Sequence, residues 1–306
     1  GEIMICIYMN DDRVKILDGK KKGSKILIKK FFDIPTKTGS LESGNIKDLM
    51  AFSQILQECI QENELKKGPA TFVIDNSRLV LKEMIVPDVA PVKVKQIITN
   101  EIFTDAKGNT NTLDYIVAER FKNEEKKKRC KVHMTYLSTD AISSIYVSGS
   151  EVELRPKVLD IGPNSTTKLI ELMIKKKMGL EETFILVDYK ETFLTLYVFD
   201  QGKRQLSKST ILYVSEDHVD INYVVSEIIN NVNSLLRFYE SRNEDRSVSA
   251  VYLTGHISIL NDSMQELADS LSMVVSHLPC PNFVLGMDLT DFNAYSCALG
   301  AFIRKG

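Results

Sequence analysis

The residues best suited to metal binding or nucleophilic catalysis are few and scattered in this sequence. His256 follows Gly255 and could act as a base, but no Ser, Cys or Asp nucleophile accompanies it, which favours a histidine that only completes a turn. The cysteines and histidines share no zinc-ligand spacing; they are Cys6, Cys59, Cys130, Cys280 and Cys297, and His133, His218, His256 and His277. The sequence therefore predicts no metal site and no catalytic residue. An odd number of scattered cysteines also indicates reduced thiols in a reducing compartment.

Charged clusters offer two weaker candidates. Glu181 and Glu182 near Asp188 could form a carboxylate cluster, but such pairs more often lie solvated at the end of a strand. The basic run at 126–129 falls in an expected hairpin loop, and a basic loop can touch an anionic membrane surface. Runs of like charge are usually just hydrated, so we interpret this loop as solvent-exposed.

Composition limits the class of protein. The chain has 306 residues, of which 43% are hydrophobic, so it can form packed cores in two domains of ordinary size. Lys and Arg number 39 against 41 Asp and Glu, and this balance argues against a nucleic-acid partner. No apolar run is long enough to cross a bilayer, and no signal-peptide pattern opens the sequence. We expect a cytoplasmic protein without direct membrane insertion.

The elements that must position any site follow one plan twice. In the first part, strands are expected at 3–9, 13–17 and 25–34, a helix at 46–65 and a strand at 71–74. The second part repeats this order, with strands at 183–188, 193–199 and 205–214, a helix at 221–239, a strand at 248–254, a helix at 264–271, a strand at 273–277 and a helix at 292–303. An internal repeat of this kind predicts two similar α/β halves packed together.

The first copy is interrupted by additional elements. They are expected as a strand at 79–86, a helix at 92–103, strands at 113–121 and 130–137 and a helix at 139–147. The first copy then resumes with a strand at 156–161 and a helix at 165–178. We interpret 82–153 as a small αβ subdomain inserted into the first half. The first half is then 1–81 with 154–182, and the second half is 183–306.

Local strings in this order resemble a known family. The strings are Met-Ile-Val-Pro-Asp at 84–88, Asn-Glu-Ile-Phe at 100–103, Leu-Asp-Tyr-Ile-Val at 113–117, Val-Tyr-Leu-Thr-Gly at 251–255 and Ala-Leu-Gly-Ala at 298–301. Together with the insertion, they resemble the PilM family of type IV pilus assembly proteins, which belongs to the actin-like superfamily and is related to FtsA. The resemblance covers nearly the whole chain. It implies a duplicated actin-like (ribonuclease H-like) α/β fold with a small inserted αβ subdomain.

The same resemblance implies a nucleotide site, whose first turn is altered here. Actin-like proteins hold ATP and magnesium with hairpin turns that need an Asp for the metal shell and a Gly for close approach of the phosphate. In the first turn, Tyr8 stands in the Asp position and Asn10 in the Gly position, and only Lys15 matches. Asp11 and Asp12 add negative charge where a triphosphate would lie.

The two other implied nucleotide turns are also altered. Asp188 is retained in the second turn, but Lys190 takes the Gly position, and His256 replaces one of two glycines after Thr254. The residual nucleotide-binding set is therefore Lys15, Asp188, Lys190 and Gly255. We expect no cofactor and no hydrolysis, with binding of ATP and magnesium as the alternative, because Lys190 could still pair with a phosphate as a point charge.

The resemblance also implies a partner. PilM-like scaffolds dock the N-terminal cytoplasmic tail of a PilN-type membrane protein and meet other pilus assembly proteins, which would recruit this chain to the inner face of the membrane. The implied groove lies between the first half and the insertion, and an extended tail could add along a strand edge there. We expect the contacts within 81–88 and 92–103, from Met84, Ile85, Val92 and Ile102, although such side chains are also common in cores.

Two alternatives remain open from the sequence. One is an active actin-like ATPase or small-molecule kinase, against which the altered turns count. The other is an FtsA-like membrane-linked filament adaptor, which would need an amphipathic tail after the last helix; the sequence given stops at Arg304-Lys305-Gly306.

Overall fold

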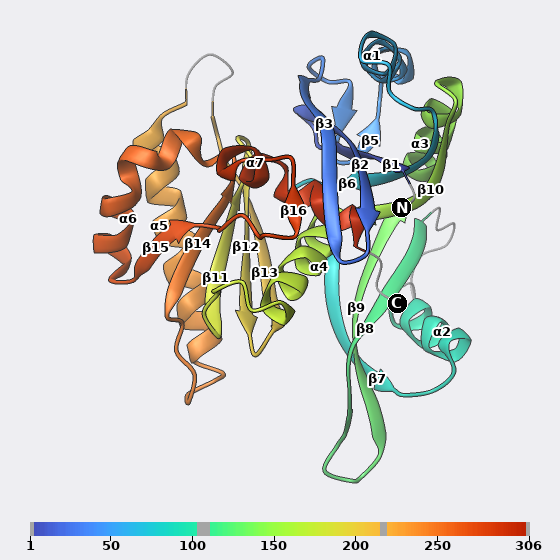
Figure 1. Ribbon diagram of the computed structural model, residues 1–306. Coiled ribbons are helices and arrows are strands. Elements are labelled where there is room, and N and C mark those ends of the chain that lie inside the picture. Colours follow the sequence, from blue (N-terminus) through green and yellow to red (C-terminus); the bar gives the residue numbers. More distant parts are fainter. Residues whose placement is uncertain (1–2, 103–110, 215–218, 304–306) are drawn as a thin grey trace.

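The computed structural model describes residues 3–102, 111–214 and 219–303 (Figure 1). Its first large sheet has the strand order β10-β6-β1-β2-β3-β16. These strands are β1 (Ile3–Met9), β2 (Arg13–Lys22), β3 (Lys25–Pro35), β6 (Gly68–Ile74), β10 (Leu154–Ile161) and β16 (Val284–Leu285). The last of these comes from the C-terminal part of the chain and pairs with β3. β2 runs five residues beyond the predicted strand end, into the turn before β3.

The second large sheet has the order β13-β12-β11-β14-β15. Its strands are β11 (Thr183–Tyr189), β12 (Phe193–Asp200), β13 (Lys203–Ile211), β14 (Ala250–Gly255) and β15 (Val274–His277). In both sheets the first three strands in sequence pair antiparallel, and the first pairs in parallel with the strand after the long helix. Apart from β16, which has no counterpart in the second sheet, the two sheets therefore share one strand order and one set of directions.

Helices cover both faces of each sheet. The helices are α1 (Leu49–Glu62), α3 (Thr139–Glu151), α4 (Gly162–Lys175), α5 (Ile221–Glu240), α6 (Met264–Leu271) and α7 (Leu289–Leu299). Alternate residues of β1 enter two different cores: Ile5 and Ile7 pack with α1 and α3, whereas Cys6 and Tyr8 face the core shared with α4 and α7. A strand buried on both faces must be apolar throughout, and this explains its sequence.

One core joins the two halves. It contains Leu169 of α4, Phe292 of α7, Leu17 of the first sheet and Phe184 of the second sheet. The helices α4 and α7 therefore lie between the sheets, as the figure also shows (Figure 1). The outer face of the second sheet is covered by α5 and α6, which contribute Ile228 and Leu267, respectively, to a separate core.

The inserted elements form a third, smaller layer. β7 (Leu81–Pro87), β8 (Asn111–Lys122) and β9 (Lys128–Ser138) make a sheet of order β7-β9-β8, with α2 (Pro91–Ile102) packed on it. The β8–β9 hairpin projects away from both large sheets (Figure 1). Unlike these elements, α3 packs against the first large sheet through Ile145. The exact boundary of the insertion stays a prediction.

Two short pieces complete the described structure. β4 (Leu41–Glu42) and β5 (Asn45–Ile46) form a small hairpin before α1. The 3-10 helices η1 (Ile257–Ser263) and η2 (Gly300–Phe302) follow β14 and α7, so the predicted last helix ends earlier than 303. No helix among the described residues is long and apolar enough to cross a membrane.

Candidate functional site

The predicted nucleotide turns meet between the two halves, where Lys190 forms a buried ion-pair cluster. Its Nζ lies 2.6 Å from Oδ2 of Asp188 and 2.9 Å from Oδ2 of Asp75. Asp188 is the penultimate residue of β11 and belongs to the second half, whereas Asp75 directly follows β6 of the first sheet. Side chains of all three residues are at most 4% exposed. One ammonium group therefore forms an ion pair with a carboxylate from each half.

Asp75 was missed by the sequence analysis. The available signal was its place immediately after a buried parallel strand, because the carboxyl ends of parallel strands are where polar site residues gather. Tyr8 donates a hydrogen bond from its hydroxyl to Asp75 Oδ2 at 3.0 Å, and Asn10 Nδ2 donates to the Tyr8 hydroxyl at 3.3 Å. The two residues that replace Asp and Gly in the first turn therefore build the cluster.

The electrostatics of this cluster favour a charged lysine. Burial by itself lowers the pKa of Lys190, but Asp188 and Asp75 outweigh it and hold that pKa well above its ordinary value. Burial also raises the pKa of Asp188, although Lys190 opposes this shift. The cluster is thus an internal ion pair whose cation is tethered to the protein.

The four predicted nucleotide-site residues come together, but almost no space remains between them. Lys15, Lys190 and Gly255 line a cavity of about 10 Å³, and Asp188 pairs with Lys190 beside it. Such a volume holds about one water molecule. Lys15 Nζ is engaged as well, because it donates to the Ala294 carbonyl at 2.6 Å and lies 3.4 Å from Asp33 Oδ2. The nucleotide-binding role of these four residues stays a prediction.

The turn after β14 is also tightly closed. Gly255 has a φ of +90°, and a Cβ atom placed there would lie 2.1 Å from the Tyr189 carbonyl oxygen. The Nδ1 atom of His256 lies 3.5 Å from the Oε1 atom of Glu191. No group of three or more potential metal ligands occurs in the parts of the chain that the structure describes.

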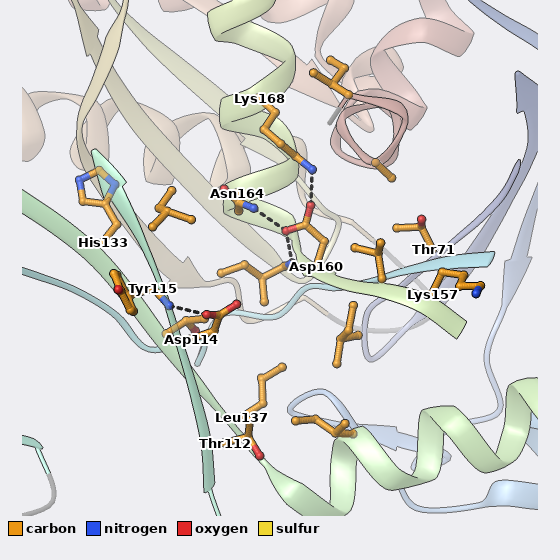
Figure 2. Close-up of a pocket in the computed structure, with 18 of the residues that line it drawn as sticks. Thr71, Thr112, Asp114, Tyr115, His133, Leu137, Lys157, Asp160, Asn164 and Lys168 are labelled. Atoms are coloured by element: carbon orange, nitrogen blue, oxygen red, sulfur yellow. Dashed lines mark hydrogen bonds and ion pairs between the residues drawn. The ribbon is translucent and has the colours of Figure 1, made fainter. Parts of the chain in front are cut away.

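A much larger cavity lies between the first sheet and the insertion (Figure 2). Its volume is about 570 Å³, within the range of typical ligand sites. Apolar side chains form much of the lining; they include Met4, Leu81, Ile142, Tyr146, Val158, Leu159 and Ile303. β8 and β10, which both line it, are the last strands of their sheets, so each has one edge without a strand partner in the described structure.

Polar groups gather at one end of this larger cavity. Asp160 accepts hydrogen bonds from Asn164 Nδ2 and Lys168 Nζ, both at 2.6 Å (Figure 2). Arg204 of β13 reaches the same cavity and hydrogen-bonds His133 Nδ1 at 2.8 Å. The cavity therefore combines strand edges, an apolar surface and fixed charges, which is what recognition of an extended peptide needs.

The residues predicted to bind the partner lie elsewhere. Ile85 and Val92 are 64% and 71% exposed, and Met84 packs against the core beneath α2. None of these three lines the large cavity, whereas Leu81 does. Ile102 ends α2, and its side chain falls outside the described residues.

Comparison with known proteins adds information at the level of the fold. No protein-family model matches this sequence, and no curated protein matches it. A chain of the "PilM-PilN type IV pilus biogenesis complex" is 17% identical, with a TM-score of 0.79, and the match covers 98% of this chain and 97% of that one.

Two further solved structures agree with this likeness. The ethanolamine utilization protein EutJ from Carboxydothermus hydrogenoformans is 10% identical with a TM-score of 0.56, covering 99% of this chain and 90% of that one. A Bacteroides thetaiotaomicron protein with an actin-like ATPase fold and unknown function is 13% identical with a TM-score of 0.52, covering 92% of each chain. The predicted fold class is thereby confirmed: this chain has the duplicated actin-like fold.

Proposed function

We propose that this chain is a PilM-like scaffold of a type IV pilus or related secretion system, and that it docks a peptide in the cavity between β8 and β10. The observation that carries the proposal is a contrast between two sites. The nucleotide turns are closed around Lys190, whereas a cavity of about 570 Å³ remains beside two free strand edges. The likeness to a chain of the PilM-PilN complex supports a PilN-type partner.

The proposed ligand is the short N-terminal cytoplasmic segment of a PilN-type membrane protein. Its backbone would pair with the free edge of β8 or β10, and alternate side chains would enter the apolar part of the cavity. A segment that becomes ordered on binding loses conformational entropy, so we expect micromolar affinity at best. Through this partner, and with other pilus assembly proteins, the chain would work in the cytoplasm at the inner face of the membrane.

We propose further that the chain does not use MgATP. A phosphate in the cleft would have to displace Lys190 from two buried carboxylates and leave them uncompensated, which is costly. The same contacts count against the alternative of an active ATPase or kinase.

Calorimetric titration tests the docking proposal. The ligand is the N-terminal peptide of the PilN-type protein encoded beside this chain, titrated into the wild type, Val158→Glu and Val92→Glu. Val158 lines the cavity and is 44% exposed, so a charge there should block docking without disturbing the core. Val92 is exposed outside the cavity and provides the matched control.

We expect binding to the wild type and Val92→Glu and no binding to Val158→Glu, with all three folded by circular dichroism. If only Val92→Glu loses binding, the peptide binds on the outer side of α2 and not in the cavity. Absence of binding to the wild type at high micromolar concentration would refute docking by this segment.

A further inference from the structure

One buried cation in the large cavity has no carboxylate partner. Arg204 is 7% exposed and lines the cavity from β13, on the second half of the molecule. Its Nη2 atom lies 2.8 Å from His133 Nδ1, and its Nη1 atom donates to the Pro163 carbonyl at 3.5 Å. Neither partner is a carboxylate, and no carboxylate of the described residues forms an ion pair with this guanidinium.

The neighbouring charges are already compensated. Asp160 pairs with Lys168 at 2.6 Å, and Glu83 lies 2.9 Å from both Lys131 Nζ and His133 Nε2. Arg204 can only donate, so His133 Nδ1 accepts from it, while Nε2 of the same ring faces Glu83. Among the enclosed charges that line the cavity in the described structure, the Arg204 guanidinium is thus the one without an ion pair, although Glu83 and Glu171 attract it from a greater distance.

An uncompensated guanidinium in this position costs free energy that a ligand can recover. Burial lowers the pKa of Arg204, which reflects the cost of keeping its charge away from water. A guanidinium has five N–H donors, and the two contacts above use two, which leaves three without a described protein acceptor. A carboxylate can accept two of these together in a fork-shaped pair.

We propose that the peptide docked in this cavity carries an Asp or Glu whose carboxylate pairs with Arg204, and that this pair sets its sequence specificity. The inference rests on the proposed function. Because β8, β10 and β13 belong to the insertion, the first sheet and the second sheet, one bound peptide would contact all three layers. Because Arg204 belongs to the second half, binding of the peptide would then depend on the position of the second half relative to the cavity.

Selection from a phage-displayed library of random decapeptides tests this inference. The targets are the complete chain as wild type, Arg204→Gln and Lys157→Gln, each checked by circular dichroism. Lys157 also lines the cavity, but it is exposed, so its removal is a control for nonspecific attraction of acidic peptides. Arg204→Lys is the second variant, and it keeps the charge without the fork.

We expect the wild type and Lys157→Gln to select peptides with Asp or Glu at one fixed place relative to their apolar residues. Arg204→Gln should lose this preference, and Arg204→Lys should weaken it. Replacing that acid by its amide in a selected peptide should weaken binding to the wild type about tenfold or more and leave binding to Arg204→Gln nearly unchanged.

Two results would overturn the inference, and each has a different consequence for the proposal that a peptide docks in the cavity. Selected peptides without an acidic position, or with one that persists in Arg204→Gln and Arg204→Lys, would refute the role of Arg204. If Val158→Glu blocks those same peptides, docking in the cavity still stands. If the wild type selects no peptide at all, peptide docking and the acidic preference fall together.

Discussion

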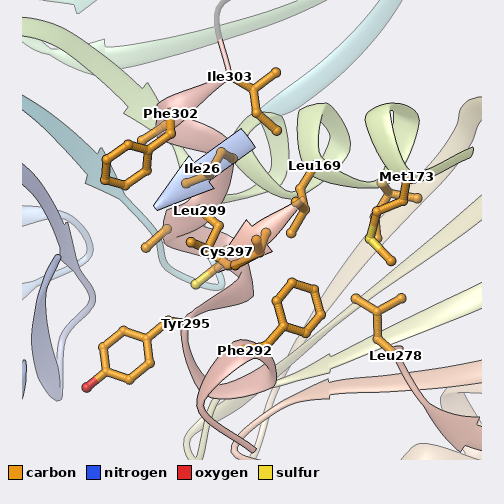
Figure 3. Close-up of a cluster of buried hydrophobic side chains, with 14 of the residues drawn as sticks. Ile26, Leu169, Met173, Leu278, Phe292, Tyr295, Cys297, Leu299, Phe302 and Ile303 are labelled. Carbon is orange, nitrogen blue, oxygen red and sulfur yellow. The ribbon is translucent and has the colours of Figure 1, made fainter. Parts of the chain in front are cut away.

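Lys190 Nζ in the second half of the molecule lies 2.9 Å from Oδ2 of Asp75 in the first half. In an actin-like fold, this cleft is where the resemblance places a nucleotide and its metal ion. Here a tethered ammonium bridges the halves through Asp75 and Asp188. The bridge lies beside an extensive apolar contact, in which Phe292, Tyr295 and Leu299 of α7 pack with Leu169 of α4 (Figure 3).

Removing the tethered cation should strongly destabilise the protein. In Lys190→Met, two buried carboxylates lose their counter-charge, and breaking a buried pair in this way costs about 3–5 kcal/mol. Urea denaturation measures the free energy of unfolding, with the exposed Lys157→Met as the control, for which we expect a change below about 0.5 kcal/mol. A loss below about 1 kcal/mol for Lys190→Met would mean that the cluster does not hold the halves together.

The closed cleft should give no ATPase activity. We expect phosphate release with MgATP to match a buffer control, and Asp188→Ala to leave this rate unchanged, because Lys190 lies where the family resemblance places the phosphates. Steady-state phosphate release checks this. Turnover above the control that disappears in Asp188→Ala would show that the cleft opens and works.

Gly255 should tolerate no side chain. In Gly255→Ala the Cβ atom would lie 2.1 Å from the Tyr189 carbonyl oxygen, in a backbone conformation with φ of +90°. Gly23→Ala is the matched control, since its φ is +60° with no atom near the added Cβ. We expect Gly255→Ala to lose at least about 2 kcal/mol more than the control in urea denaturation. Equal losses would mean that the turn after β14 relaxes freely.

The contact of Glu83 with His133 and Lys131 should appear in the pH dependence of stability. Burial tends to raise the pKa of Glu83, but hydrogen bonds from His133 and Lys131 outweigh burial and lower that pKa below its ordinary value of 4.5. A lowered folded-state pKa stabilises the protein above the unfolded-state value, and this contribution is lost as pH falls through the folded-state pKa.

Denaturation at several pH values tests this contribution. The wild type should lose more stability than Glu83→Gln as pH falls from about 5.5 to about 3. Parallel curves for the two proteins would show that Glu83 is not stabilised by this contact. The variant also keeps the shape of the side chain, so packing near β7 should be unaffected.

The fold was predictable from sequence because its signals are local and repeated. Some elements can be recognised from a single segment, such as the apolar strand that contains Cys6 and Tyr8 and the long helix that contains Ile228. The internal repeat then indicates the order in which the elements follow one another. The altered turn residues Tyr8, Asn10 and Lys190 were also visible. Their role in the structure was not visible, because Asp75, which contacts both Tyr8 and Lys190, is 115 residues away from Lys190.

The resemblance implied a groove between the first half and the insertion, but the side chains that line the large cavity could not be predicted from local patterns. The lining combines strands of separate sheets, among them β8 and β10, whose relative placement cannot be predicted from any single segment. One signal was available for Val92: the buried face of α2 carries Val94 and Ile98, four positions apart, and a residue two positions before Val94 lies on the opposite side of a helix. The helical period therefore already indicated that Val92 faces solvent.

The central claim is that a PilN-type partner occupies the cavity between β8 and β10. Site-specific photo-crosslinking tests it most directly, with benzoylphenylalanine placed at Tyr146, which lines the cavity and is 46% exposed, or at Val92, which is exposed outside it. The full-length PilN-type protein encoded beside this chain, held in vesicles, is the partner. We predict crosslinks to its N-terminal segment from position 146 and none from position 92. Crosslinks from position 92 alone, or from neither position while the two proteins still co-purify, would contradict the account.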